Sequence, residues 1–311
     1  MPMRALRLTG LLARITGGAT LVLIAAGGLV TSTGAGLAVP DWPTTFGENL
    51  FLFPWSRMVG GVLVEHTHRL LGATVGLLTV ALGVTAWLQD RRGRVRALAA
   101  LAVGLVGLQG LVGGLRVVLR EDLLGLLHGC FAPVFFAVTV ALAVCAGPAR
   151  LAAPTSETGS RPGSRLAVLA TVVTLILYGQ IVLGALATHG GWARTHIGGA
   201  VVAVGAVTIL VGSARGAPDA GVVGLGRGLG GLLVLQVTLG LGAYLARSTG
   251  VAVPGGEAVA IGLPVAHRVV GAGLLGTSVA LALRAWRWTL PRPTPGRGVV
   301  DPRLATTRVP A

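Results

Sequence analysis

The chain has 311 residues, of which 53% are hydrophobic and only 11% are charged. This composition excludes an ordinary soluble domain. The formal net charge is +15, but aromatic residues make up only 5% of the chain. Since a nucleic-acid site would need stacking residues among its basic ones, we expect no nucleic-acid partner.

Eight apolar segments are each long enough to cross a bilayer, whose hydrocarbon core of roughly 30 Å takes about 20 helical residues. They predict an all-α integral membrane protein with eight transmembrane helices. The first segment follows three arginines, as in a signal peptide, but seven spans follow it without a clear cleavage site, so we expect a helix. The boundary between the fifth and sixth segments is the least distinct. The segments span residues 11–31, 63–88, 97–118, 123–146, 166–187, 195–213, 228–247 and 264–286.

All 25 basic residues are arginines, and they gather in alternate loops. Because positively charged loops stay in the cytoplasm, this pattern predicts a plasma-membrane protein with both termini inside. The tail from about residue 291, rich in proline, is expected to be disordered. The predicted inner loops hold Arg91, Arg92, Arg94, Arg96, Arg150, Arg161, Arg165, Arg215 and Arg227, and the outer ones Arg57, Arg116, Arg120, Arg194 and Arg247.

Four histidines lie near the outer ends of alternate segments. They are His68, His128, His196 and His267, in segments two, four, six and eight. An imidazole inside hydrocarbon is costly and therefore suggests a function. Two facing histidines on neighbouring helices suit a haem with two axial ligands to its iron. The alternative is four hydrogen-bonded helix-end histidines without a cofactor.

Two further histidines compete with these candidates. His66 points away from His68 on a helix, which leaves it near the outer loop or at a substrate entry. His189 lies seven residues before His196, in the predicted loop before segment six. It is the rival ligand if that segment begins earlier.

An internal duplication is indicated by the order of short similarities. Leu108-Gln109-Gly110 in segment three resembles Leu235-Gln236-Val237 in segment seven, and each half has two histidine-bearing segments. We therefore expect two pseudo-symmetric four-helix bundles in one orientation. The predicted domains are an N-terminal bundle at 1–148, a cytoplasmic linker at 149–165, a C-terminal bundle at 166–288 and a disordered tail at 289–311.

The halves differ in one carboxylate. Glu65 precedes His68 by three residues and so shares its helix face. The corresponding residues are Ala193 before His196 and Pro264 before His267. This asymmetry suggests that one site reacts, whereas the other conducts electrons or stabilises the fold.

Two arginines directly follow candidate ligands. Arg69 and Arg268 could each bind haem propionates through a guanidinium fork, or contact lipid headgroups or another helix. Cys130 and Cys145 lie in one segment, about 22 Å apart along a helix, so they are expected to be free thiols.

The chain resembles the haem A synthase family. The resemblance rests on Gly36-Leu37-Ala38-Val39-Pro40-Asp41-Trp42-Pro43 in the first outer loop and on Glu65-His66-Thr67-His68-Arg69 opening segment two. It extends to about residue 288 through Gln109-Gly110 and the single histidines of segments four, six and eight. Many members carry a cysteine pair in the first outer loop, whereas this chain has none there.

The resemblance implies that a methyl group of haem O is oxidised to a formyl group, giving haem A for terminal oxidases. His68 and His128 would hold the substrate haem, with Glu65 acting as a proton acceptor or stabilising positive charge. His196 and His267 would hold a resident haem b. Expected partners are membrane lipid and haem O, and candidate partners are a haem O synthase, an electron donor and a second copy of the chain.

Two other function classes stay open at this point. A di-haem b-type membrane cytochrome for electron transfer would need the same four histidines but would give Glu65 no task. A transporter would have four incidental histidines, and discontinuous helices would favour it.

Overall fold

The computed structural model describes residues 2–147, 163–248 and 254–287. Eight helices in this part of the chain are long and apolar enough to cross a membrane, so the prediction of a multi-pass, all-α membrane protein is confirmed. Almost all of the predicted linker and the predicted tail lie outside the described residues. The helices are α1 Pro2–Ser32, α2 Gly60–Gln89, α3 Gly93–Leu119, α4 Asp122–Ala146, α5 Gly163–Gly190, α6 Ala193–Arg215, α7 Ala220–Ser248 and α8 Gly256–Trp286.

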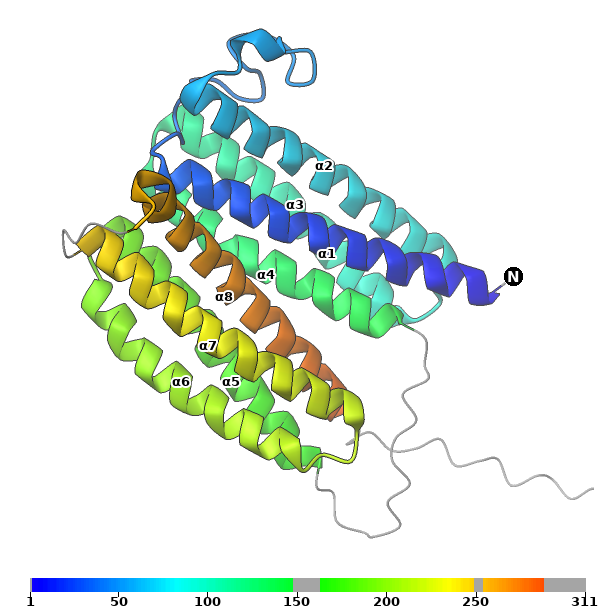
Figure 1. Ribbon diagram of the computed structural model, residues 1–311. Helices are drawn as coiled ribbons and strands as arrows, with labels where there is room; N and C mark the ends of the chain where they lie inside the picture. The colour runs from blue at the N-terminus through cyan, green and yellow to red at the C-terminus, as the bar shows by residue number, and fades with distance from the viewer. Residues whose placement is uncertain (1, 148–162, 249–253, 288–311) are drawn as a thin grey trace, which may run out of the picture.

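The helices form two cycles of neighbours (Figure 1). Helix α1 packs against α2 and α4, and α3 also packs against both. In the same way α5 and α7 each pack against α6 and α8. Helix α8 additionally contacts α1 and α4, and α4 contacts α5, so these three contacts join the two cycles. Whether a pseudo-symmetry axis relates the cycles stays a prediction.

Each cycle has its own buried cluster. One cluster includes Leu82, Val95 and Leu142 from α2, α3 and α4. The other includes Val207, Leu229 and Leu281 from α6, α7 and α8. Many leucines and valines outside these clusters are exposed, as expected for helices that face lipid and pack mainly through small residues.

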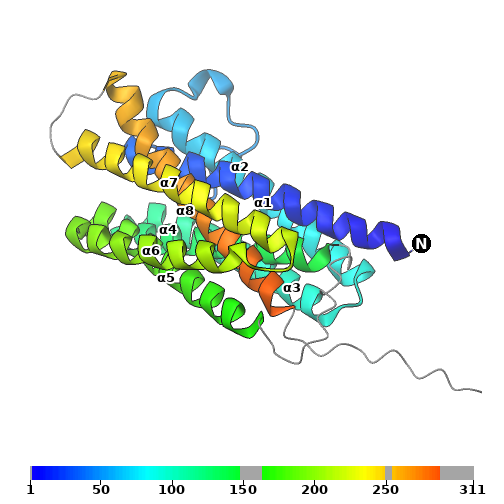
Figure 2. The same cartoon turned by 60° about the horizontal axis from the view of Figure 1, so that its bottom comes forward.

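The longest described connection joins α1 to α2. It contains a short 3-10 helix, η1 at Trp55–Arg57, and lies at the end of the molecule opposite the N-terminus (Figures 1 and 2). The Asp41 carboxylate organises this loop by accepting hydrogen bonds from Thr44 Oγ1 and from the backbone N–H of Phe46 and Gly47. Burial raises the pKa of Asp41, but these hydrogen bonds outweigh it and hold the pKa below its usual range. Asp41 is therefore a charged anchor of the loop.

All eight helices extend beyond the predicted apolar segments, and three of these extensions bear on the site or on the predicted boundaries. Helix α5 continues to Gly190, so His189 lies in its last turn and the prediction that it lies in a loop is wrong. Helix α7 begins at Ala220 and α8 at Gly256, each eight residues before the predicted start. Pro264 is consequently inside α8, where it removes one backbone donor without ending the helix.

Candidate functional site: two facing histidine pairs

The four histidines of the apolar segments form two pairs across helices. The ring centroids of His68 on α2 and His128 on α4 are 6.3 Å apart, with the ring planes at 83°. The centroids of His196 on α6 and His267 on α8 are 6.2 Å apart, with the planes at 82°. The two pairs thus have nearly the same geometry, and each helix cycle contains one pair.

A glycine on the preceding helix lies against each imidazole. A Cβ atom built on any of these glycines would approach the histidine Cε1 to between 2.7 and 3.1 Å, which is too close for an ordinary contact. Since a larger residue would displace the ring, the glycines fix the positions that the imidazoles can occupy. The four contacts are Gly27 to His68, Gly113 to His128, Gly184 to His196 and Gly240 to His267.

Backbone carbonyls orient two of the rings. Nδ1 of His128 lies 3.1 Å from the Gln109 carbonyl oxygen, and Nδ1 of His267 lies 3.1 Å from that of Gln236. A carbonyl oxygen can only accept, so Nδ1 carries the proton in each ring and Nε2 carries the lone pair. This is the arrangement that a metal-ligating histidine uses.

These observations fit a flat metal-centred group between the two rings of each pair. Imidazole nitrogens bind metals at about 2.0–2.1 Å, so two rings on opposite sides of one ion have centroids roughly 6 Å apart, as in both pairs. The described residues contain no group of three or more histidine, cysteine, aspartate or glutamate side chains that could hold a metal ion. A site with two protein ligands suits a haem iron, whose other four ligands come from the macrocycle.

Glu65, three residues before His68 on α2, is buried, and both of its oxygens are hydrogen-bonded. Oε2 accepts from the backbone N–H of Val39 at 2.9 Å, and Oε1 accepts from Arg69 at 2.7 Å. The Glu65 side chain is 4% exposed and that of Arg69 10% exposed. The carboxylate therefore connects α2 to the outer loop as one half of a buried ion pair, which is costly unless its hydrogen bonds are satisfied.

The two predicted propionate-binding arginines make contacts within the protein. Arg69 donates to the carbonyl oxygens of Asp41, Thr44 and Val39 at 2.7, 3.0 and 3.1 Å. Arg268 donates to the Gly28 carbonyl and to Ser32 Oγ, both at 3.0 Å. Arg69 thus fastens the outer loop to α2, and Arg268 joins α8 to α1.

The two competing histidines lie apart from the pairs. His66 is 1% exposed, with Nδ1 3.1 Å from Thr45 Oγ1 and its ring against Phe53, so it packs under the outer loop. His189 is exposed and takes no part in the ring pair that His196 forms with His267. Cys130 and Cys145 are free thiols, as predicted.

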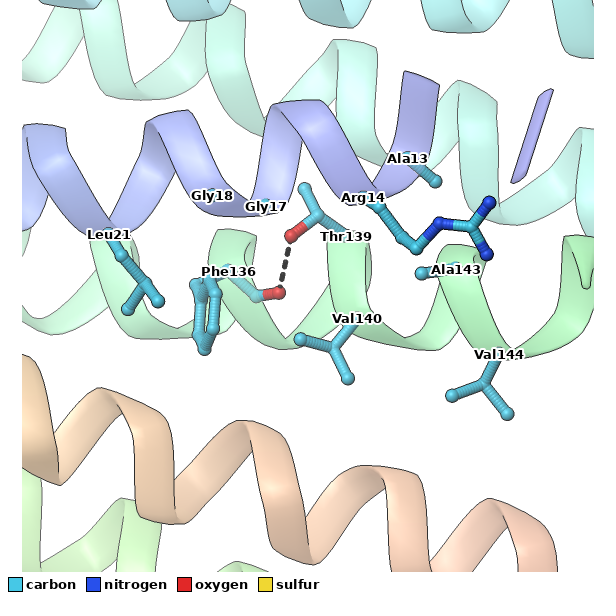
Figure 3. A pocket seen from close by; sticks show the side chains of 10 residues that line it. All are labelled: Ala13, Arg14, Gly17, Gly18, Leu21, Phe136, Thr139, Val140, Ala143 and Val144. Carbon is cyan, nitrogen blue, oxygen red and sulfur yellow. Dashed lines mark hydrogen bonds between the residues drawn. The ribbon is translucent and has the colours of Figure 1, made fainter. Parts of the chain in front are cut away.

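An open apolar groove lies between α1 and α4 (Figure 3). It is lined by Leu21, Phe136 and Val140 among others, with Arg14 at its edge. Thr139 Oγ1 donates to the Phe136 carbonyl at 2.7 Å within α4. Phe136 follows His128 by eight residues, about 12 Å along the helix, and no lining residue is a metal ligand. The groove is therefore separate from the histidine pairs.

Three glutamines inside helices lie next to the histidines, and the sequence indicated only two of them; Gln109 is buried, and Gln180 and Gln236 are half-buried. Gln109 and Gln236 were noticed as parts of a repeat, but Gln180, which lies against His196, was missed. The available signal was a glutamine inside an apolar segment followed four residues later by glycine, at Gln109, Gln180 and Gln236. In a chain with 50 glycines that spacing does not stand out until the glycines are seen against the histidines.

The chain is similar in sequence to known proteins of haem biosynthesis and cytochrome oxidase assembly. A family model described as cytochrome oxidase assembly protein matches residues 11–197. A haem A synthase of Alkalihalophilus pseudofirmus is 34% identical over 35% of this chain and 36% of its own length. Another, of a Methylobacterium species, is 38% identical over 44% of this chain and 40% of its own length.

A protohaem IX farnesyltransferase of Haloarcula marismortui is 40% identical over 32% of this chain and 19% of its own length. The matched segments thus cover less than half the length of each of these relatives. The family model, in contrast, spans more than half of the chain and includes His68, His128, Glu65 and the outer loop. This chain belongs to the cytochrome oxidase assembly protein family COX15-CtaA.

Proposed function

We propose that this protein is a haem A synthase, which oxidises a methyl group of haem O to a formyl group and supplies haem A to terminal oxidases. The observation that carries the proposal is the presence of two facing histidine pairs in a member of the cytochrome oxidase assembly family. The names of the relatives support the same reaction. No observation favours the di-haem cytochrome or the transporter.

The two pairs would have different tasks. His68 and His128 would ligate the iron of substrate haem O, and His196 and His267 that of a resident haem b. The support is Glu65, which lies one helical turn from His68, whereas Ala193 and Pro264 are at the corresponding positions of the second half. Because a carboxylate lies three residues before His68 but not before His196 or His267, we assign the reacting methyl to the first pair.

The chemistry defines what the protein has to provide. Converting a methyl to a formyl group removes four electrons and adds one oxygen atom, so it needs an external electron acceptor and an oxygen source. A haem held by the histidines would supply the redox chemistry that passes these electrons on. The protein's own groups position the macrocycle and stabilise charge next to it. Glu65 would do so as a carboxylate held by Arg69 and by Val39 N–H, near the site of proton loss.

The arginines after the ligands would act near the haem edges. Arg268 on α8 would bind a propionate of the second haem while joining α8 to α1. Arg69 uses both terminal nitrogens on the loop and on Glu65, so it would approach a propionate only as part of that network.

We place the protein in the plasma membrane with both termini in the cytoplasm and both haem sites toward the outer face. The support is the arginine-rich pattern of alternate loops. The candidate partners are an enzyme that makes haem O, an electron donor and a second copy of the chain. The similarity to a protohaem IX farnesyltransferase supports a connection to the preceding step of haem modification.

The test is pigment analysis after production in a host that makes haem O but no haem A. Haem A extracted from the membranes or the purified protein supports the proposal. Haem B alone, with both pairs loaded, contradicts it and identifies an electron-transfer cytochrome.

A further inference from the structure

The groove between α1 and α4 lies where the two helix cycles separate. Near the outer loop α8 packs against α1, since a Cβ atom built on Gly28 would lie 3.6 Å from Val265 Cα. Toward the N-terminal end of the molecule these two helices diverge, with α4 between them (Figures 1 and 2). There α8 packs against α4, because a Cβ atom on Gly276 would lie 2.7 Å from Phe136 Cε1. The groove runs beside this contact, along the seam between the cycles.

The walls of the groove are mostly apolar, and its length suits a hydrocarbon chain. Leu21 and Gly18 line it on α1, and Phe136, Val140 and Val144 line it on α4 (Figure 3). From Phe136 to Val144 the groove extends about 12 Å along the helix. One leaflet contributes about 15 Å to the hydrocarbon core of a bilayer. An acyl chain parallel to the helices would therefore lie in the groove over most of its length.

Two adjacent glycines of α1 shape the groove differently. A Cβ atom built on Gly17 would lie 3.3 Å from Thr139 Oγ1, so Gly17 lets α1 approach α4 closely. A Cβ atom built on Gly18 would have no other heavy atom within 4 Å, and Gly18 is exposed. Gly18 therefore leaves open space at the surface of the groove, which a larger side chain would fill without displacing a neighbour.

Arg14 places a charge at the edge of this apolar surface. It belongs to the apolar span Leu8–Ser32 and forms no hydrogen bond or ion pair with any residue that the structure describes. A cation at this depth is costly without a partner. Side chains lean toward the N-terminus of their helix, so the guanidinium extends toward the end of α4, as Figure 3 shows. It can reach lipid headgroups there while its stem covers apolar surface.

A second arginine lies at the same end of the groove. Arg287, directly after α8, donates to the Val144 carbonyl at 2.7 Å. Asp90, which is connected to the end of α4 through Arg92, is held by that arginine in an ion pair. Within the described ranges neither Arg14 nor Arg287 is paired with a carboxylate. The groove thus ends in two positive charges that call for an anion.

We propose that this groove binds an anionic phospholipid of the inner leaflet, with its phosphate at Arg14 and Arg287 and one acyl chain along Leu21, Phe136 and Val140. Basic pockets between transmembrane helices on the cytoplasmic side suit anionic headgroups, and the leaflet follows from the proposed orientation of the chain. The lipid fills the seam where α1 and α8 separate and so holds the two helix cycles together.

The test counts lipids bound to the purified full-length protein by native mass spectrometry. Dioleoyl phosphatidylglycerol is the anionic probe, and dioleoyl phosphatidylcholine, which has the same acyl chains and no net charge, is the comparison. Arg14→Gln and Arg287→Gln each remove one charge, and Arg215→Gln at the exposed end of α6 is their control. Gly18→Leu fills the groove. Gly104→Leu is its control, because Gly104 is also exposed and a Cβ atom there would have no other heavy atom within 4 Å.

We expect one tightly bound phosphatidylglycerol that phosphatidylcholine does not replace. Arg14→Gln and Arg287→Gln should each weaken its binding about fivefold, the equivalent of about 1 kcal/mol for one arginine at an anionic membrane surface. Gly18→Leu should weaken it about tenfold, because a side chain and an acyl chain cannot occupy the same space. Both control variants should bind the lipid as the parent does.

Equal binding of the two lipids by the parent would overturn the proposal, as would arginine variants that bind phosphatidylglycerol within twofold of the parent. Unchanged lipid binding in Gly18→Leu, with loss of haem O binding or of the parent oligomer, would overturn it too, since the groove would then hold the substrate or a second copy of the chain. If Gly18→Leu does not accumulate in membranes, the arginine variants decide. Lipid counting does not depend on turnover, so absence of haem A would contradict only the proposed function.

Discussion

Glu65 is the residue whose surroundings most restrict the chemistry of the first pair. Its carboxylate accepts hydrogen bonds from Arg69 and Val39 N–H, so it is held in place rather than free to rotate. A fixed negative charge one turn from His68 suits stabilisation of developing positive charge or uptake of a proton. The same contacts attach the outer loop to α2.

We expect Glu65→Ala to lower haem A formation by about 100-fold, as for the loss of a positioned acid–base group. Haem b proposed at His196 and His267 should remain, since neither of these histidines has a carboxylate three residues before it. Haem content and haem A yield are measured on the same preparation. Arg69→Lys, which keeps a cation for Glu65 but not the guanidinium fork that donates to the loop carbonyls, is the control for loop anchoring.

If Arg69→Lys reduces haem A as strongly as Glu65→Ala, the carboxylate acts mainly by holding the loop. An unchanged haem A yield in Glu65→Ala would remove Glu65 from the mechanism altogether.

His267→Ala should remove most of the proposed resident haem b while the chain remains inserted, because one of the two histidines that would hold it is lost. The measurement is the low-spin absorbance spectrum of the purified variant. His189→Ala is the matched control and should retain the parent spectrum, since His189 is exposed and outside the ring pair. A full low-spin spectrum in His267→Ala, or its loss in His189→Ala, would contradict the assignment.

At the scale of helices, the connections at the end of the molecule opposite the outer loop are fastened by ion pairs. Asp90 follows α2 and accepts hydrogen bonds from Arg92 at 2.8 and 2.5 Å, while Arg92 also donates to the Cys145 carbonyl of α4 at 2.8 Å. In the second cycle Asp219 accepts from Arg284 of α8 at 2.9 Å. These contacts attach the α2–α3 connection to α4 and the α6–α7 connection to α8, each within one helix cycle.

Hydrogen bonds from Arg92 hold the pKa of Asp90 below its ordinary value of 3.8. A carboxyl whose folded pKa is depressed contributes stability above its unfolded pKa, and this contribution is lost as pH falls through the folded pKa. Asp90→Asn should therefore lower stability in detergent by about 1 kcal/mol at pH 7, and the difference should shrink below about pH 4.

Thermal unfolding of the parent and Asp90→Asn proteins from pH 7 down to about pH 2, which is below the ordinary carboxyl range, is the measurement. A difference that did not change with pH would mean that Asp90 acts through packing and not through its charge.

Element types were predictable from the sequence because eight runs of apolar residues exceed the thickness of a bilayer. The ends of the helices were harder to predict. Helix α7 begins at Ala220 although Arg227 interrupts its apolar run, and α8 contains Pro264 where the sequence suggested a start. Hydropathy reports where a helix meets lipid, whereas helix ends depend on backbone hydrogen bonds that continue beyond the hydrocarbon.

The histidine pairs could be predicted from the common depth of the four histidines in alternate segments. The residues that hold the imidazoles in place could not. Gln180 and the glycines against the rings become visible only when neighbouring helices are placed side by side. The hydrogen bonds of Glu65 to residues 26 positions earlier and four positions later likewise depend on the folded outer loop.

At the scale of the whole molecule, the arrangement predicts a direction across the membrane. Replacing Cys130 and Cys145 by serine should leave haem A formation within a few-fold of the parent. In this cysteine-free protein, a single cysteine introduced into a loop reports the side of the membrane on which the loop lies. Leu52→Cys in the outer loop, where Leu52 is 78% exposed, should react with an impermeant thiol reagent on intact cells. Gly216→Cys, between α6 and α7, should react only after the cells are opened.

Labelling of Gly216→Cys but not of Leu52→Cys on intact cells would invert the predicted topology and place the histidine pairs toward the cytoplasm.

The central claim is that two histidine pairs of nearly the same geometry serve a haem-modifying enzyme rather than an electron-transfer protein. The most direct measurement is extraction and separation of the haems bound to protein purified from cells that make haem O but have no other source of haem A. We predict haems B, O and A together, and loss of haem A but not of haem B in Glu65→Ala. Haem B alone in the parent protein would contradict the account.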